Sequence, residues 1–386
     1  MTIRDLDWKR GYGLVLTSLS IVAVRVLVGV GASKIGGTFI VHRQGGRAMS
    51  TGLVSSLTHW DAHWYIGIAR HGYPTLRAHA FYPAYPALIR LVSPVFGYSG
   101  GALVIAWVAA VFAVWGVIDV TSRFTRPETA LMAGLLFVWN PASIFLMAAY
   151  PEGLLVALMI WSLRFALDRR WWPAALLAGV ASCVLPQGTI TSLAVVLGVL
   201  VAEPSNRRFA KALLVGVIGE VGLISYVIFC WATTGNPLVI PKAESVGWHN
   251  QFTYPFHVVL RQLVMIVNSP ASGQVRSVYV LNACAGILGG AMAAIGLYLG
   301  WRERRLLLPA VLLALGVLVS VLTIDIGVDS TARFILFQAP LYVIGAVIAD
   351  RLGDGTRTLV TTNVLVISTT LAVLYGAMYN FGWWLT

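Results

Sequence analysis

One short stretch of the sequence joins a carboxylate to aromatic side chains in a way that could serve chemistry. It reads Trp60-Asp61-Ala62-His63-Trp64-Tyr65. Trp60 and Trp64 are four residues apart and would share one face of a helix, and Trp and Tyr favour the boundary between lipid and water. Asp61 would then lie at that boundary, where a carboxylate can accept a proton from a hydroxyl group. The structural alternative is that Asp61 is the N-cap of a helix over 62–71 that ends at Gly72.

Two further charged residues stand where apolar runs begin. Glu152 follows Tyr150 and a proline. A glutamate in a first helical turn interacts favourably with the helix dipole, or it could orient a substrate near the first carboxylate. Arg333 follows a loop that contains Asp325 and Asp329. We expect these loop carboxylates to pair with Arg333, unless its guanidinium contacts a phosphate group.

Other cationic or partly cationic groups could also bind a phosphate. These candidates are His63, Arg77, His79 and Lys242. A phosphate leaving group needs positive charge nearby as its own negative charge develops. The alternative is that loops of moderate length simply tolerate exposed basic residues.

Composition defines the setting for these residues. The chain has 386 residues, of which 58% are hydrophobic and 11% charged, and its mean hydropathy is +0.80. Soluble globular chains carry about 25% charged residues, so this composition excludes a water-soluble enzyme and predicts an all-α polytopic membrane protein. The 3 cysteines lie in apolar runs and predict neither disulfides nor a cysteine metal site. The net charge of +12 indicates cytoplasmic loops and contact with membrane lipids, rather than nucleic acid.

Runs of about 20 apolar residues predict the spans. The candidates are 11–32, 100–122, 128–147, 152–168, 209–232, 277–300, 305–324, 332–349 and 358–380, with 173–202 interrupted at Leu185-Pro186-Gln187-Gly188. The run 11–32 is longer than the apolar part of a signal peptide, so we expect it to be retained. The basic clusters fall on one side if 173–202 crosses twice and Phe81–Gly97 lies in the interface as a helix. This gives about eleven spans, within a range of about ten to twelve.

The resulting topology is a single integral domain over 1–386 in the cytoplasmic membrane, with its N-terminus in the cytoplasm. Two long loops, 33–99 and 233–276, would face the extracytoplasmic side. The first loop would hold the interfacial helices and Asp61, and the second would hold Lys242.

Charged residues inside spans are costly and require an explanation. Arg25 and Glu220 lie at similar depth in two predicted spans, because each helical residue rises about 1.5 Å. They could form a structural pair, or they could line a path for a lipid or a transported substrate.

Several motifs in the sequence resemble those of a known family. After Trp60-Asp61 and Trp64-Tyr65 come Gly72-Tyr73, Phe81-Tyr82-Pro83-x-Tyr85-Pro86, Asn140-Pro141-Ala142-Ser143-x-Phe145, Ala149-Tyr150-x-Glu152, Thr234-Gly235-Asn236-Pro237 and Arg333-Phe334 followed by Pro340. In this order they resemble PIG-V-type mannosyltransferases (GPI mannosyltransferase II type) of the GT-C class of membrane glycosyltransferases. The resemblance spans roughly 55–345. It implies a GT-C fold with a long first extracytoplasmic loop.

The resemblance also implies a reaction. Such an enzyme would move a sugar, most simply mannose, from a polyprenyl-phosphate donor to a glycolipid or lipoglycan acceptor outside the membrane. Asp61 would be the general base of an inverting single displacement, and neither a metal nor another cofactor is expected. The residues expected to bind substrate are Trp60, His63, Trp64, Tyr65, Arg77, His79, Tyr150, Glu152, Lys242 and Arg333.

Two other functions remain open from sequence. A flippase or transporter for a lipid-linked sugar would place its critical ionisable residues near mid-membrane, as Arg25 and Glu220 would be. A non-catalytic scaffold would tolerate the loss of Asp61. The absence of an internal repeat disfavours a transporter.

Overall fold

Apolar α-helices make up nearly all of this computed structural model, which describes residues 3–36, 53–204, 206–268, 273–324 and 330–380. The helices are α1 (Ile3–Gly36), α2 (Leu53–Ser56), α3 (Asp61–His71), η1 (Leu76–Ala80), α4 (Ala84–Thr121), α5 (Pro127–Val138), α6 (Ile144–Met147), α7 (Glu152–Leu167), α8 (Trp171–Ala181), α9 (Gly188–Ala202), α10 (Arg208–Gly219), α11 (Val221–Thr234), α12 (Val239–Trp248), α13 (His257–Asn268), α14 (Gly273–Arg302), η2 (Arg304–Leu306), α15 (Leu307–Val321), α16 (Thr331–Leu336), α17 (Ala339–Asp350) and α18 (Asp354–Asn380). Two short strands, β1 (Gln251–Phe252) and β2 (Thr323–Ile324), pair antiparallel.

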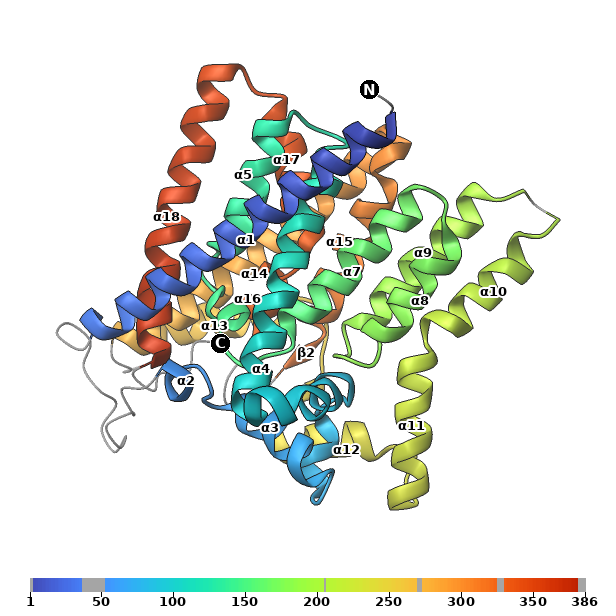
Figure 1. Cartoon of the computed structure of the whole chain (residues 1–386), viewed down its shortest axis with the longest axis vertical. Coiled ribbons are helices and arrows are strands. Elements are labelled where there is room, and N and C mark those ends of the chain that lie inside the picture. The colour runs from blue at the N-terminus through green and yellow to red at the C-terminus, as the bar shows by residue number, and fades with distance from the viewer. Residues whose placement is uncertain (1–2, 37–52, 205, 269–272, 325–329, 381–386) are drawn as a thin grey trace.

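The helices form a multi-pass bundle, and different elements lie at its two ends (Figure 1). In Figure 1, α1 crosses the front of the bundle diagonally, while α10 and α11 project to the right. The link between α17 and α18 lies at the upper end, and α2, α3 and α12 lie at the lower end. At the upper end, Arg126 before α5 pairs with Asp354 at the start of α18, with 2.7 Å between Nη1 and Oδ1.

Fewer described helices are long enough to cross a membrane than the number of predicted spans. Five described helices are long and apolar enough to cross a membrane, or up to six if the bent pair α10–α11 counts as one span. The shorter apolar helices α5, α8, α9, α13 and α17 have 10–17 residues. The count of about eleven spans therefore stays a prediction, as does the interfacial position of Phe81–Gly97.

The first part of α4 is set apart from the rest by a bend at Gly97. Gly97 has φ +67° and ψ 168°, which breaks the helix into two segments. A positive φ is accessible to glycine at little cost. The Tyr85 hydroxyl in the first segment donates to the Ala102 carbonyl in the second at 2.8 Å and so fixes the bend. The bend falls at the end of the segment that the sequence predicts to be interfacial.

The interruption in 173–202 is a turn between two helices that pack side by side. α8 ends at Ala181 and α9 begins at Gly188. A Cβ on Gly188 would collide with the backbone of Ala181 and Ser182, so only glycine lets the chain turn this tightly. The predicted hairpin is therefore present, and two crossings by its arms stay a prediction.

Three predicted single spans are broken instead. The run 128–147 ends as α5 at Val138 and resumes as the short α6, because Asn140-Pro141 forms a turn in which Asn140 Oδ1 accepts the Ala142 N–H at 2.9 Å. The run 332–349 is divided into α16 and α17 just before Pro340, and the residue before a proline disfavours helix. These breaks create the short helices on which the candidate site is built.

The third break is between α10 and α11, which meet at 53°. Gly219 and Gly222 flank this break and pack directly against α9 and α8, leaving no room for a Cβ. Glycine weakens a helix and allows this close approach. Glu220 therefore lies at a bend, and 209–232 is not one straight span.

Candidate active site

Asp61 is the first residue of α3. Tyr150, in the loop before α7, holds the chain around Asp61 in place. The Asp61 backbone N–H donates to the Tyr150 hydroxyl at 3.1 Å, and that hydroxyl donates to the His59 carbonyl at 3.2 Å. The first N–H groups of a helix have no partner within the helix, so Tyr150 supplies one. Gly72 ends α3 as predicted, with its N–H on the Ile68 carbonyl at 2.8 Å.

The alternative that Asp61 is the N-cap is wrong. Trp60 occupies the N-cap position, at φ +58°, and no side chain caps the helix. A positive φ is strained for a tryptophan. The Asp61 carboxylate is directed to a different element, since its Oδ2 accepts from Arg333 Nη1 at 3.1 Å.

Arg333 lies on α16, which is anchored by α14. Asn282 of α14 accepts the Ala332 N–H at 2.8 Å through its side-chain oxygen. Besides Asp61, the Arg333 guanidinium bonds Glu152 through both Nε and Nη2. Its central carbon also lies 4.7 Å from the Phe145 ring centroid and 4.8 Å from that of Tyr150. Cation–π contacts of this kind add to the ion pairs.

The two carboxylates that bind Arg333 differ in how far their side chains are exposed. The Glu152 side chain is 2% exposed and that of Asp61 is 20% exposed, while Arg333 is 5% exposed. Glu152 does begin a helix, as its position predicts, but it also compensates the buried arginine. Among the described residues, no donor bonds Asp61 Oδ1, so one oxygen of the exposed carboxylate is available.

His59 and the Tyr150 hydroxyl stay neutral near pH 7. Burial, and secondarily the neighbouring His63, lower the pKa of His59 to about 4. Burial raises the pKa of Tyr150 well above its ordinary value. The Tyr150 hydroxyl therefore keeps the proton that it donates to the His59 carbonyl.

Tyr379 and Phe145 complete the site. The Tyr379 hydroxyl, near the end of α18, donates to the same His59 carbonyl at 3.2 Å, and its ring meets Phe145 edge-on. Tyr379 was not predicted, and its only sequence signal is an aromatic residue near the end of an apolar run. Phe145 is the last residue of the Asn140–Phe145 motif, although no separate role was predicted for it.

The remaining predicted residues lie elsewhere around α3. Trp64 stacks on Phe81 and meets Trp248 of α12 edge-on, whereas Tyr65 is buried between the rings of Phe81, Tyr85 and Tyr150. These contacts give Trp64 and Tyr65 a packing role. The sequence alone did not distinguish this role from substrate binding.

The predicted cationic residues fall into two groups. His79 is buried, with its ring on Tyr73 and Nδ1 3.0 Å from the Thr75 carbonyl, so the structure does not present it to a ligand. His63, Arg77 and Lys242 are exposed. Arg77 lies against Gly247 of α12. Asp325 and Asp329, the partners expected for Arg333, lie outside the described residues.

The predicted pair of Arg25 and Glu220 is wrong. Arg25 bonds Ser143 from Nε and Nη2, both at 3.1 Å, and lies over the Trp139 ring. Glu220 lies at the α10–α11 bend, beside α8 and α9, with no ion pair among the described residues. Similar depth did not bring the two residues to the same helix interface.

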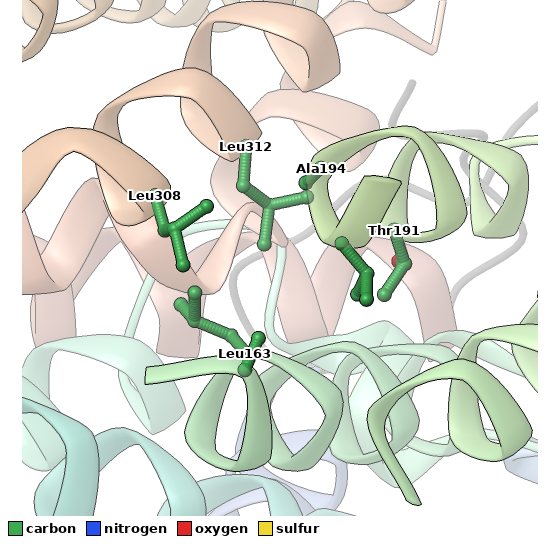
Figure 2. Close-up of a pocket in the computed structure, with 7 residues that line it drawn as sticks. Leu163, Thr191, Ala194, Leu308 and Leu312 are labelled. Carbon is green, nitrogen blue, oxygen red and sulfur yellow. The ribbon is translucent and has the colours of Figure 1, made fainter. Parts of the chain in front are cut away.

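A separate small cavity, with room for about one water molecule, lies between α7, α9 and α15 (Figure 2). Its lining is Leu163, Ala166, Thr191, Ala194, Val195, Leu308 and Leu312. Apart from Thr191 the lining side chains are apolar, so this cavity has no set of groups suited to a sugar or a phosphate. The chemistry of the molecule lies at the Asp61 cluster.

Part of the chain is similar to a known family. Residues 46–218 match the family described as Mannosyltransferase (PIG-V), a segment that includes Asp61 and Glu152 but not Arg333. Over this segment the chain resembles that family. It is 31% identical to mouse GPI alpha-1,6-mannosyltransferase 2 over 153 residues, which are 36% of this chain and 31% of that protein. It is 30% identical to the rat protein of the same name over 218 residues, 53% of this chain and 42% of that protein.

The chain thus covers less than half the length of these curated relatives. Among solved structures, ArnT from Cupriavidus metallidurans bound to undecaprenyl phosphate is similar over 94% of this chain and 75% of ArnT, with a TM-score of 0.53 and 12% identity. At this identity the likeness concerns the fold alone.

Proposed function

We propose that this protein transfers mannose from a polyprenyl-phosphate donor to a lipid-linked or lipoglycan acceptor on the extracytoplasmic side of the membrane. The match of 46–218 to a mannosyltransferase family supports the sugar and the reaction class. The similarity to the rodent GPI alpha-1,6-mannosyltransferases supports a lipid-linked acceptor. One observation carries the assignment: a partly exposed carboxylate at the start of α3, held by one oxygen with the other available.

Asp61 is the general base in this proposal. An acceptor hydroxyl donates its proton to Asp61 Oδ1 while its oxygen forms a bond to the anomeric carbon. The bond from that carbon to the phosphate oxygen breaks, and polyprenyl phosphate leaves with the electron pair. A single displacement inverts the anomeric configuration and needs no covalent intermediate. The leaving phosphate is already a weak base, so the reaction requires neither a general acid nor a metal cofactor.

Arg333 and Glu152 have a supporting role in this reaction. Arg333 fixes the direction of the Asp61 carboxylate through Oδ2. Glu152 compensates the charge of the same buried guanidinium. Since Arg333 already bonds two carboxylates, the exposed Arg77 and Lys242 are better suited to the donor phosphate.

The decisive experiment is Asp61→Asn, assayed by transfer of labelled mannose from polyprenyl phosphate to membrane lipid. Asparagine keeps the shape of the side chain and can still accept from Arg333, but it is not a proton acceptor at neutral pH. We expect transfer to fall by about 10²- to 10⁴-fold. Protein yield and thermal stability should be nearly unchanged.

Two comparisons sharpen this test. Glu128→Gln removes an exposed carboxylate from the first turn of α5 and should leave transfer at the wild-type rate. A flippase would keep moving lipid-linked sugar with asparagine at position 61. Wild-type transfer by Asp61→Asn would overturn the catalytic role.

A further inference from the structure

α13 is an apolar helix that is too short to cross a membrane. It has 12 residues, which at 1.5 Å per residue give a length of about 18 Å. The hydrocarbon core of a bilayer is about 30 Å thick. The next helix, α14, contains the run Val275–Arg302, which is long and apolar enough to span. α13 therefore needs an environment of its own, different from that of the span that follows it.

One face of α13 is docked on α14. Val259 occupies the space beside Gly286, and Phe256, just before α13, occupies the space beside Gly290, so a Cβ on either glycine would collide with these side chains. Gly286 and Gly290 are one turn apart on the same face of α14. Small residues of this kind let membrane helices approach closely. The packing thus fixes which sides of α13 face away from the bundle.

A second face of α13 is apolar and exposed. Leu260, Leu263, Val264 and Val267 are spaced at i, i+3, i+4 and i+7, which places them on one stripe of the helix. All four side chains are exposed. In a water-soluble protein such a stripe faces the core, and a contiguous exposed apolar surface marks a site of contact with protein or membrane.

A third face of α13 carries polar residues. These are His257, Arg261 and Asn268, whose intervals of four and seven residues keep them on one side of the helix. A helix with an apolar stripe and a separate polar face is suited to the boundary between lipid and water, where it lies parallel to the membrane plane.

The surroundings of α13 favour lipid over protein as the partner of the apolar stripe. Tyr254 precedes the helix and is exposed, and tyrosine is enriched at the level of the lipid head groups. α14, on which α13 packs, exposes Val280, Ile287 and Leu288 along its span. The stripe therefore belongs to a helix pair whose other exposed apolar surface lies in the membrane.

We propose that α13 lies in the lipid–water boundary and binds membrane lipid through the stripe of Leu260, Leu263, Val264 and Val267. These side chains insert about 5–10 Å into the boundary between head groups and acyl chains. The polar face of α13 is directed to the head groups and water.

This position matters to the candidate active site because α13 also packs against α16. Val258 and Val259 share an apolar cluster with Ile335. Arg333 lies on the same short helix as Ile335 and bonds Asp61. A helix fixed at the lipid boundary thus holds the carboxylate cluster near that boundary. The lipid contact goes beyond the proposed function and does not depend on it.

The test is the depth of spin labels in the full chain, measured by EPR power saturation in lipid nanodiscs. One label is attached at Val264→Cys, one at Ser245→Cys on α12 and one at Leu288→Cys near the middle of α14, all at exposed positions. Cys284, the exposed native cysteine, is replaced by alanine throughout, and the signal of the Cys284→Ala protein is subtracted.

We expect the label at position 264 to lie about 5–10 Å below the lipid phosphates, between the label at 245 in water and the label at 288 in the hydrocarbon core. A label at 264 as accessible to a water-soluble nickel reagent as the label at 245 would overturn the proposal, and so would a label as deep as that at 288. A label at 264 that neither oxygen nor the nickel reagent reaches would mean that protein covers the stripe, which also contradicts the proposal.

A charge on the stripe provides a second test with a matched control. Val267→Glu places a carboxylate on the apolar stripe and should shift the label at 264 toward water, because an ionised group is costly in hydrocarbon. Asn268→Glu adds the same charge one residue later, on the polar face, and should leave the depth unchanged. Equal depths in the two variants would overturn the assignment of the stripe to lipid.

Asp61→Asn separates this proposal from the proposed function. It should lose mannose transfer while the label at 264 keeps its wild-type depth. Transfer at the wild-type rate in Asp61→Asn would overturn the proposed function alone, and a label at 264 in water would overturn the lipid contact alone.

Discussion

Arg25 and Arg333 are the two arginines that the described structure buries, and their surroundings differ in one decisive respect. Both lie against aromatic rings, Arg25 over Trp139 and Arg333 between Phe145 and Tyr150. Arg333 also has two carboxylate partners, whereas Arg25 has one hydroxyl partner. The charge of Arg333 is therefore compensated inside the protein, whereas among the described residues Arg25 is stabilised only by a hydroxyl group and an aromatic ring.

The pairing of Arg333 also explains the order of burial within the candidate site. Glu152 is the more buried carboxylate and holds the guanidinium through two nitrogens. Asp61 is more exposed and receives the third. The buried pair can thus serve as a rigid support for the exposed base, which is the arrangement that catalysis by a positioned carboxylate needs.

The largest effect that this comparison predicts is on stability. Arg333→Met would leave Glu152 buried without its cation. Removal of one partner from a buried ion pair costs about 3–5 kcal/mol, so we expect the free energy of unfolding to fall by that amount. Reversible unfolding by SDS in mixed micelles would measure it.

The double variant Glu152→Leu with Arg333→Met should recover part of this loss, because no isolated charge remains at position 152. Arg207→Met, at an exposed site, should change the free energy of unfolding by less than about 0.5 kcal/mol. A loss below about 1 kcal/mol for Arg333→Met would mean that the pair is not the support described above.

A smaller loss of stability is expected at Asn282, which contacts the helix that carries Arg333 and not the carboxylates themselves. Asn282→Leu removes the acceptor of the Ala332 N–H and leaves a buried donor without a partner. Such a loss costs about 1–3 kcal/mol. Because α16 carries Arg333, mannose transfer should fall as well, and both quantities can be measured on the same preparation.

Asn363→Leu is the matched control for this variant. Asn363 is exposed on α18, and its side chain bonds only the Leu359 carbonyl of its own helix. It should leave transfer unchanged. If Asn282→Leu matched this control in both stability and transfer, the anchoring of α16 by α14 would not matter to the site.

The sequence alone predicted the class of fold and the place of Asp61 in a short helix. Composition identified a helical membrane protein, and Trp60–Tyr65 singled out Asp61 on a helix that ends at Gly72, as the structure has it. These features are local, since they depend on apolar runs, aromatic spacing and a glycine. The motifs at Asp61, Tyr150, Glu152 and Arg333 were also recognised, and the structure brings these four residues together.

The partners of the buried charges could not be predicted in the same way. Arg333 was expected to pair with the loop carboxylates Asp325 and Asp329, which lie outside the described residues. The partners that the described residues supply come from positions 61 and 152. The breaks at Asn140-Pro141 and before Pro340 decide which short helices face one another. A sequence pattern indicates that a buried charge needs a partner, yet the packing of distant helices selects it.

The smallest predicted effect concerns Arg25 and Glu220, which were considered a pair only because they lie at similar depth in their predicted spans. Arg25 and Glu220 were matched because each is a charge at a similar position along an apolar run. The structure places Arg25 against Ser143 and Trp139, and Glu220 at the bend between α10 and α11. Depth fixes a residue's height in the membrane, but not the helix face it occupies or the neighbour it meets. We therefore expect the effects of Arg25→Met and Glu220→Gln on the free energy of unfolding to add within about 0.3–0.5 kcal/mol, as independent sites do. A double-mutant cycle by SDS unfolding measures the difference. A coupling above about 1 kcal/mol would restore the direct pair.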